Sequence, residues 1–436
     1  MKAFSRYRWI VVAIIMGFML LHQIDRLLIG SMAKQISEEF NINDAEFGKI
    51  VSGALVVAAI CYPIWGYLYD RYARAKLLAL ASFIWGATTW LSALARTYPT
   101  FRMARATTGI DDSSYPGIFS LIADYFGPTL RGKIYGLLYL TQPLGFLVGM
   151  GLGLIVSGLM GWRNIFYLTG AMGIVIAVLI FFFVKEPKRG MSEPELEDMQ
   201  EISTFKFDWQ TARDLFKNRT LRMLYIQGFF GVFPWNAITY FFILYMQRER
   251  QYEDMTIYIM MGIAVMVLAA GYPIAGALGD YLFKLNPKGR LIVAMTGVII
   301  GAVMMIITLS IPRDNQLLFA ISLTVNAFFI PFATANVISS VYDVTLPEVR
   351  STALSIQSII ESAGPAFAPW IVGEISIRYD LKTAFLIICP IAWFLGFIFF
   401  NVAARYIPGD IQTLRSIMRE RADHERMIQG EQMVGD

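Results

Sequence analysis

The sequence predicts an all-α membrane protein with twelve transmembrane helices in two pseudo-symmetric six-helix bundles. Three observations support this prediction: an apolar composition, twelve long apolar runs and an internal repeat. Of the 436 residues, 56% are hydrophobic and only 16% are charged, whereas a soluble domain carries about a quarter charged residues. This composition argues against a soluble, disordered or nucleic-acid-binding protein.

The apolar runs have the length of membrane spans. A helix needs about 20 mostly apolar residues to cross a bilayer, and helices satisfy the backbone groups that the hydrocarbon core leaves without water. The first run carries Asp25 and Arg26 and is followed by no small-residue cleavage site, so we expect no signal peptide there. The expected spans are 9–31, 47–69, 77–95, 101–123, 134–159, 164–184, 221–246, 255–279, 290–312, 316–341, 352–375 and 383–405.

Basic residues in the connections predict the orientation. With the N-terminus inside, the inner segments hold 25 of the 37 Lys and Arg residues and the outer segments hold 10. Cytoplasmic loops carry such an excess of positive charge. We therefore expect both termini in the cytoplasm and a multi-pass protein of the cell membrane.

A long polar break divides the spans six and six. The stretch 185–220 is rich in charge and contains Pro187, Gly190 and Pro194, which interrupt regular structure. The expected domains are an N-terminal six-helix bundle over 1–184, a cytoplasmic linker over 185–220, a C-terminal six-helix bundle over 221–405 and a cytoplasmic tail over 406–436.

Two sequence echoes relate the halves. YPIWGYLYD at 62–70 matches YPIAGALGD at 272–280, and DYFGPTLR at 124–131 shares Asp-x-x-x-Pro-x-x-Arg with DVTLPEVR at 343–350. The matches occur in the same order at similar offsets, which indicates a duplicated six-helix unit. Parallel repeats of this kind are typical of a two-bundle transporter whose site lies between the halves at mid-membrane.

The end of the second span resembles the loop signature of the major facilitator superfamily. The pattern G-x-x-x-D-R-x-x-R-x-K is present, with Ala73 where a Gly is usual. Its residues are Gly66, Asp70, Arg71, Arg74 and Lys76. The resemblance covers nearly all of the chain and implies the fold of that superfamily.

Within the superfamily, the chain is most similar to the spinster-like transporters. The first half carries most of this resemblance, and the organic anion:cation symporter branch, which shares the Asp-Arg of the first span and a similar fourth span, stays open. The matching pieces are IDRLLI at 24–29, ISEEFNINDAEFGKI at 36–50, MARATTGIDD at 103–112, LIADYFGPTLRGK at 121–133, GWRNIF at 161–166, VKEPKRG at 184–190 and GPAFAPWIVGEIS at 364–376.

Charged residues inside the first span are candidates for proton coupling. Such charges are costly in a bilayer and need a partner or a wet cavity. His22, Asp25 and Arg26 have the i, i+3, i+4 spacing of one helix face. Asp25 is a candidate proton carrier, with exposure to water at the outer mouth as the alternative. His22 could relay protons or pack as a hydrogen-bonded side chain.

The fourth span holds a second cluster, formed by Arg105, Asp111 and Asp112. Arg105 and Asp112 are seven residues apart, about two helical turns, so we expect them on one face. The spinster resemblance gives Asp112 the position of a family carboxylate, while Asp111 replaces a usual Gly. Asp25, Arg105 and Asp112 could form a switchable ion pair; a static pair that stabilises the fold is the alternative.

Other polar residues are candidates for a cytoplasmic gate or for the substrate cavity. The gate residues could connect the halves or only set the topology, and the cavity residues could instead form interhelical hydrogen bonds. The gate candidates are Gly66, Asp70, Arg71, Arg74, Asp280 and Lys284. The cavity candidates are Arg26, Gln142, Asn236, Tyr240, Asn326, Asn336 and Glu361.

The sequence predicts a transporter and not an enzyme. It contains no Walker pattern and no His/Cys metal cluster, so we expect no cofactor and no metal. The leading hypothesis is a monomeric, proton-coupled secondary transporter that moves an amphiphilic molecule, which the spinster resemblance implies to be a lysolipid, a sphingoid-like lipid or a drug. The alternatives are a proton-coupled organic-anion symporter, in which arginines bind a carboxylate, and a non-transporting receptor on the same fold.

Overall fold

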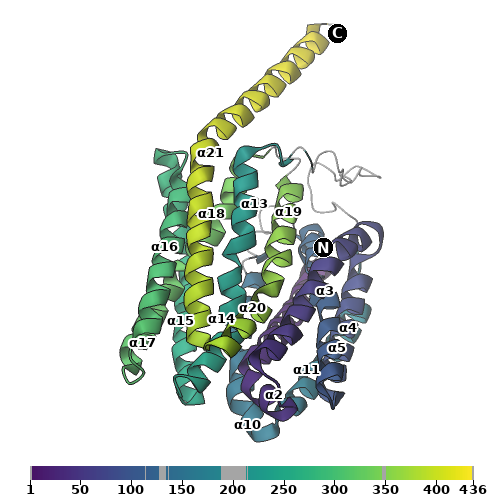
Figure 1. The fold of residues 1–436 in the computed structure, drawn as a ribbon. Helices are drawn as coiled ribbons and strands as arrows, with labels where there is room; N and C mark the ends of the chain where they lie inside the picture. Colours follow the sequence, from purple (N-terminus) through teal and green to yellow (C-terminus); the bar gives the residue numbers. More distant parts are fainter. Residues whose placement is uncertain are drawn as a thin grey trace.

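A computed structural model gives the arrangement of the helices. It describes residues 2–112, 114–126, 134–135, 137–187, 213, 215–345 and 350–434. Figure 1 shows two groups of helices side by side, with both chain termini toward the upper end and α2 at the lower end. We call these ends of the molecule the terminal end and the α2 end.

The first group contains the helices up to α11. Its long members run between the two ends, and short members complete the interrupted spans. These helices are α1 (Lys2–Ser31), α2 (Ala33–Phe40), α3 (Asp44–Arg71), α4 (Arg74–Leu94), α5 (Tyr98–Thr107), α6 (Gly109–Asp112), α7 (Pro116–Tyr125), α9 (Thr141–Gly151), the π-helix η1 (Leu152–Val156), α10 (Ser157–Met160) and α11 (Trp162–Phe183).

The second group follows the polar break, of which residues 188–212 lie outside the described part of the chain. Its last helix continues beyond the bundle into the tail (Figure 1). The helices are α13 (Arg219–Gly231), α14 (Phe233–Arg248), α15 (Asp254–Leu285), α16 (Gly289–Ser310), α17 (Gln316–Phe329), α18 (Pro331–Asp343), α19 (Arg350–Ala363), the 3-10 helix η4 (Pro365–Phe367), α20 (Ala368–Arg378) and α21 (Leu381–Val434).

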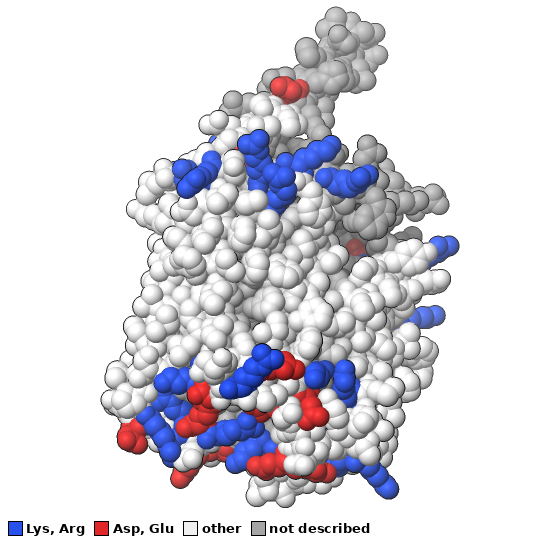
Figure 2. Space-filling model, viewed as in Figure 1, with Lys and Arg blue, Asp and Glu red and all other residues white. Residues whose placement is uncertain are grey.

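Within the described residues, ten helical stretches are long and apolar enough to cross a membrane. The other two expected spans, 101–123 and 352–375, correspond to α5–α6–α7 and α19–η4–α20, which are interrupted helices. Figure 2 agrees with a membrane position, because charged side chains gather toward the two ends while much of the surface between them is uncharged. The helix arrangement is therefore consistent with twelve spans.

Prolines explain where several spans are interrupted. A proline has no N–H to donate and clashes with the preceding turn, so it favours the first turn of a new helix. Pro116, Pro234 and Pro331 stand at the start of α7, α14 and α18. Pro63 and Pro273, which are equivalent in the first sequence echo, lie inside α3 and α15.

A row of glycines brings α1 and the α9–η1 stretch into backbone contact. Gly145, Gly149 and Gly153 recur every fourth residue, and small residues at this spacing allow close helix approach in membranes. A Cβ added to Gly149 would lie 2.7 Å from the Ile24 carbonyl oxygen, and one added to Gly153 would lie 1.8 Å from Ser31 Oγ. These glycines position the middle of α1, where its charged residues lie.

The second sequence echo corresponds to equivalent ion pairs at the terminal end. Arg74, at the start of α4, pairs with Asp124 at the end of α7. In the second group, Arg290 of α16 pairs with Asp343 at the end of α18. Arg74 also pairs with Glu186, at 2.8 Å. The aspartate of each echo thus joins two helices of its own group.

Candidate functional site

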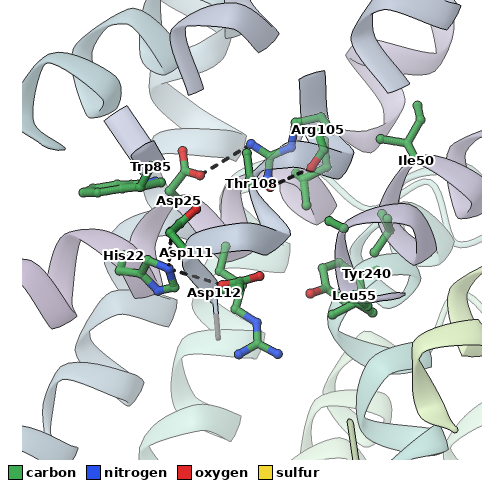
Figure 3. Close-up of a pocket in the computed structure, with 14 residues that line it drawn as sticks. His22, Asp25, Ile50, Leu55, Trp85, Arg105, Thr108, Asp111, Asp112 and Tyr240 are labelled. Atoms are coloured by element: carbon green, nitrogen blue, oxygen red, sulfur yellow. Dashed lines mark hydrogen bonds and ion pairs between the residues drawn. The ribbon is translucent and has the colours of Figure 1, made fainter. Parts of the chain in front are cut away.

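A cavity near the middle of the first group contains the charged residues of the first and fourth spans (Figure 3). Its volume is about 30 Å3 in this conformation. Helices α1, α3, α5 and α6 supply most of its wall, and Tyr240 of α14 is the one lining residue from the second group among those described. The lining residues are His22, Asp25, Arg26, Ile29, Ile50, Val51, Ala54, Leu55, Trp85, Arg105, Thr108, Asp111, Asp112 and Tyr240.

His22 contacts both carboxylates of α6. Its Nε2 lies 2.9 Å from Asp111 Oδ2 and 3.2 Å from Asp112 Oδ1, and Figure 3 shows the imidazole directed toward both. Its Nδ1 lies 3.0 Å from the Tyr115 hydroxyl, which also accepts a hydrogen bond from Gln23 Nε2. His22 and Asp111 are almost fully buried, so their polar atoms face each other and the cavity and not bulk water.

The Asp25 carboxylate has different partners. Arg105 Nη1 approaches Asp25 Oδ2 to 3.4 Å, and the Thr169 hydroxyl lies 3.2 Å from Asp25 Oδ1. The Arg105 guanidinium also lies over the Phe166 ring, 5.3 Å from its centroid, where the ring quadrupole attracts a cation. Asp25 and Arg105 are therefore a buried ion pair between α1 and α5.

The expected pairing of Arg105 with Asp112 is not present in this conformation. The expectation assumed one continuous helix from 105 to 112, but α5 ends at Thr107 and α6 begins at Gly109. This break changes the register, so Asp112 reaches His22 while Arg105 reaches Asp25. The cluster therefore consists of the Asp25–Arg105 pair and an adjoining group of His22 with Asp111 and Asp112, instead of a single Asp25–Arg105–Asp112 set.

The described lining residues of the cavity include more carboxylates than guanidiniums. Three carboxylates and two guanidiniums line it, together with His22. An unpaired charge in a low-dielectric site is costly, and such a site neutralises itself by binding a proton when it can. Asp111 Oδ1 is buried and has no hydrogen-bond partner among the described residues, which makes this carboxyl a suitable place for the proton.

Comparison with known proteins identifies the family. The family model of the Major Facilitator Superfamily matches residues 14–315. The chain belongs to the major facilitator superfamily. The curated relatives agree with the spinster resemblance: "Protein spinster" of Drosophila melanogaster is 28% identical over 397 residues, which cover 86% of this chain and 63% of that protein. "Protein spinster homolog 1" of Homo sapiens is 25% identical over 85% of this chain and 73% of its own length.

Solved structures confirm the fold of this superfamily. A crystal structure titled as a bacterial homolog of the human lysosomal transporter Spinster superposes with a TM-score of 0.73 at 19% identity, covering 94% of this chain and 98% of that chain. A D-xylose–proton symporter superposes with a TM-score of 0.69 at 16% identity, covering 92% and 97%. The chain is thus a member of the major facilitator superfamily, a family of transporters, and the curated relatives that it resembles include spinster proteins.

Most of the other residues that the sequence suggested for the substrate cavity lie outside it. The buried amides of Asn236, Asn326 and Asn336 donate to the backbone carbonyls of Pro365, Gly301 and Ala275 respectively. Glu361 is half-buried and accepts a hydrogen bond of 2.6 Å from Gln357, and Gln142 is exposed on α9. Of the candidates named from the sequence, Arg26 and Tyr240 line the cavity, and these two side chains interact with each other.

The gate candidates at the terminal end have mostly local partners. Arg74 is buried within the first group, and Arg71 donates to the Tyr67 hydroxyl at 2.6 Å. Asp280 accepts from Arg290 at 2.7 Å, and Lys284 is exposed. Gly66 has open space where a Cβ would stand. The side chain of Asp70 and the segments 127–133 and 346–349 lie outside the described part, so the role of Asp70 in a gate between the halves stays a prediction.

The two groups of helices are joined by polar contacts at the α2 end, which sequence reasoning did not single out. Asp44 at the start of α3 pairs with Arg248 at 2.8 Å and accepts a hydrogen bond from Ser376 of α20. Close to this pair, Lys49 lies 3.7 Å from Glu374. Backbone contact is tight here as well, because a Cβ added to Gly373 would lie 2.3 Å from the Asp44 carbonyl oxygen. The α2 end of the transporter is therefore closed by contacts between α3 and α20.

Replacing Asp44 by Asn should favour opening at the α2 end. The change removes the ion pair with Arg248, whose side chain is half-exposed, so we expect a loss of roughly 1 kcal/mol, or about a fivefold shift in population. In a cysteine-free background, Ala54→Cys in the cavity wall should then react faster with a membrane-impermeant thiol reagent applied from the α2 side. Asp254→Asn, which alters a surface carboxylate bonded to Gln247 at the same end, is the control. Equal labelling of both variants would argue against this gate.

Proposed function

We propose that the protein is a proton-coupled secondary transporter that moves an amphiphilic or lipophilic organic molecule by alternating access. The observation that carries this proposal is the charge composition of the cavity, where three carboxylates face two guanidiniums and one imidazole. The site is balanced only with one proton bound. Proton coupling requires a site that binds a proton while it is open to one side of the membrane and releases it while it is open to the other.

The arrangement suggests which groups hold the proton and which respond to it. His22 and Asp111 are the pair to which we assign the proton, and Asp112 lies within hydrogen-bond distance of the same imidazole nitrogen. Asp25 and Arg105 form the adjoining pair, and a change in charge on Asp111 or Asp112 alters the field at Arg105. Arg26 and Tyr240 connect the two groups of helices across the cavity, so they are placed to contact substrate and to transmit the change.

Two observations support the proposed substrate class: the pairing of the guanidiniums in the cavity and the name of one related protein. Arg105 is paired with Asp25, which leaves Arg26 as the cavity cation best placed to contact a substrate. One such cation suits an amphiphile with a single polar head better than a small di-anion. A relative of Danio rerio that is 31% identical over 177 residues, 40% of this chain and 35% of that protein, is named a sphingosine-1-phosphate transporter. We therefore place this chain's substrate among lysolipids, sphingoid-like lipids and lipophilic drugs.

The remaining assignments belong to the same proposal. The excess of Lys and Arg in alternate connections supports a cytoplasmic terminal end in a cell membrane. The described contacts then close the outer end, while Asp70, Arg71 and Lys284 serve the cytoplasmic gate. Residues 1–184 and 221–405 act as the two moving bundles, and a monomer contains the complete cavity.

Transport into proteoliposomes with an imposed pH gradient tests the proposal. Lysolipids, lipophilic drugs and organic acids are offered separately, and a protonophore added in a parallel sample removes the gradient. We expect uptake of an amphiphile that falls to the level of protein-free liposomes once the protonophore is present. If only small organic acids are taken up in response to the gradient, the protein is an anion symporter and the amphiphile proposal is wrong. If the protonophore does not change uptake, transport is not coupled to protons.

A further inference from the structure

A second, larger cleft lies on the outer surface of the joint between the two groups of helices. Its empty volume is about 1270 Å3. One wall is formed by α3 and α5, and the other by η4 and α20. The lining residues are Lys49, Ser52, Gly53, Val56, Val57, Tyr98, Pro99, Arg102, Met103, Ala106, Phe367 and Trp370.

The cleft is separate from the charged cavity. Residues 50, 51, 54 and 55 of α3 line the cavity, whereas Ser52, Gly53, Val56 and Val57 line the cleft. These sets lie on different faces of the same helix. The wall between them is a contact of small residues, because a Cβ on Gly53 would lie 3.5 Å from Ala106 Cβ. The cleft therefore faces the surroundings of the bundle and not the transport site.

The two cations of the cleft lie toward its α2 end, where Lys49 Nζ stands 5.9 Å from the centre of the Trp370 ring. Lys49 and Arg102 lie in the half nearer the α2 end, since both helices run inward from that end. Val57 is eight residues further along α3, about 12 Å away at 1.5 Å per residue. One leaflet of the hydrocarbon core is about 15 Å thick. The cleft thus has cations at the depth of lipid head groups and apolar walls at the depth of acyl chains.

The apolar part of the cleft is exposed although its side chains are large. Met103, Phe367 and Trp370 are 72%, 45% and 39% exposed. Lys49 Nζ lies 3.7 Å from Glu374, which also accepts a hydrogen bond from Trp370 Nε1 at 2.9 Å. Arg102 interacts with the Tyr98 hydroxyl, which Glu46 also influences. Among the described residues that line the cleft, two are cations and none is a carboxylate, so the lining itself presents positive charge that an anionic head group complements.

We propose that this cleft binds an acidic phospholipid of the leaflet at the α2 end. The phosphate lies between Lys49 and Arg102, and one acyl chain follows Val56, Val57 and Phe367. The phosphate competes with Glu374 for Lys49, whose ion pair joins α3 to α20. Bound acidic lipid therefore weakens the closed joint and favours opening at the α2 end. The site is independent of the proposed function, because lipid binding here needs neither a proton gradient nor a transported substrate.

Native mass spectrometry of the purified full chain tests the site. The protein is titrated with phosphatidylglycerol, with phosphatidylcholine of the same chain length and with inorganic phosphate. We expect phosphatidylglycerol to bind about tenfold more tightly than phosphatidylcholine, because one charge-assisted contact strengthens binding by roughly tenfold. The Lys49→Gln/Arg102→Gln variant should lose this preference. The matched control is Lys34→Gln/Arg96→Gln, which removes two exposed cations outside the cleft.

A second variant tests the acyl-chain part separately. Ala106→Phe fills the cleft beside Gly53 and keeps both cations. It should weaken the binding of phosphatidylglycerol by a similar factor. A phosphatidylglycerol preference that survives Lys49→Gln/Arg102→Gln, or that the control variant loses equally, would overturn the proposal. Binding of inorganic phosphate as tight as that of the lipid would also overturn it, because the occupant would then be a free anion.

Discussion

His22→Gln and Asp111→Asn should each reduce gradient-driven transport to the level of protein-free liposomes. His22 Nε2 lies 2.9 Å from Asp111 Oδ2, so either change removes one partner of the group that we propose holds the proton. Glutamine and asparagine keep hydrogen-bonding capacity at nearly the same volume but do not titrate at physiological pH. Counterflow of substrate, which moves no net proton, should persist in both variants. The measurement is uptake with and without a pH gradient in proteoliposomes of equal protein content.

Asp112→Asn gives a finer test of the same cluster. The Asp112 side chain is 17% exposed, whereas that of Asp111 is 1% exposed and has one oxygen without a hydrogen-bond partner. We therefore expect Asp112→Asn to reduce coupling less than Asp111→Asn does. Asp254→Asn at the surface serves as the control. If His22→Gln and Asp111→Asn both retained full gradient-driven uptake, the cluster would be structural and proton coupling would need another site.

Arg105→Ala should destabilise the protein strongly. The guanidinium is buried against Asp25 and Phe166, and its removal leaves a buried carboxylate whose described partner is the Thr169 hydroxyl. Breaking one side of a buried ion pair costs about 3–5 kcal/mol. A thermal unfolding scan in detergent should show a clearly lowered midpoint together with loss of transport, including counterflow.

The double variant Asp25→Asn/Arg105→Gln separates charge from packing. It removes both charges of the pair and keeps polar groups that can hydrogen-bond to each other. We expect it to recover most of the unfolding midpoint that Arg105→Ala loses, while gradient-driven transport stays absent. A double variant that unfolds as easily as Arg105→Ala would show that the packing of Arg105 on Phe166, and not its charge, stabilises this region.

The sequence predicted the fold well because the apolar runs and the two echoes record properties of whole helices. The second echo proved especially informative, since Asp124 and Asp343 pair with Arg74 and Arg290 at equivalent places. What it did not predict were the interruptions of the fourth and eleventh spans. Both spans read as one apolar run, and only prolines such as Pro116 and Pro365 marked the interruptions.

The sequence named the charged residues of the cavity and Tyr240 but not the other neutral residues around them. A charge inside a membrane span is rare and usually functional, so Asp25, Arg105 and Asp111 could be recognised from the sequence. Tyr115 and Thr169, which complete the hydrogen bonding, belong to residue types that are common in membrane helices. The expectation placed Arg105 beside both Asp25 and Asp112. In this conformation Arg105 pairs with Asp25, and Asp112 lies beside His22 because α5 ends at Thr107 and α6 begins at Gly109.

The one-sided origin of the cavity charges has an electrical consequence. Every ionisable Asp, Arg and His that lines the cavity comes from the first group of helices, and the second group contributes Tyr240. In the proposed cycle, this set is neutral with its proton and carries one negative charge without it. A full elementary charge crossing the membrane field changes the free energy by about 2.3 kcal/mol per 100 mV. We therefore expect the membrane potential to act on the deprotonated return step and to leave the loaded step nearly unaffected, so that voltage sets the rate of recovery between transport events.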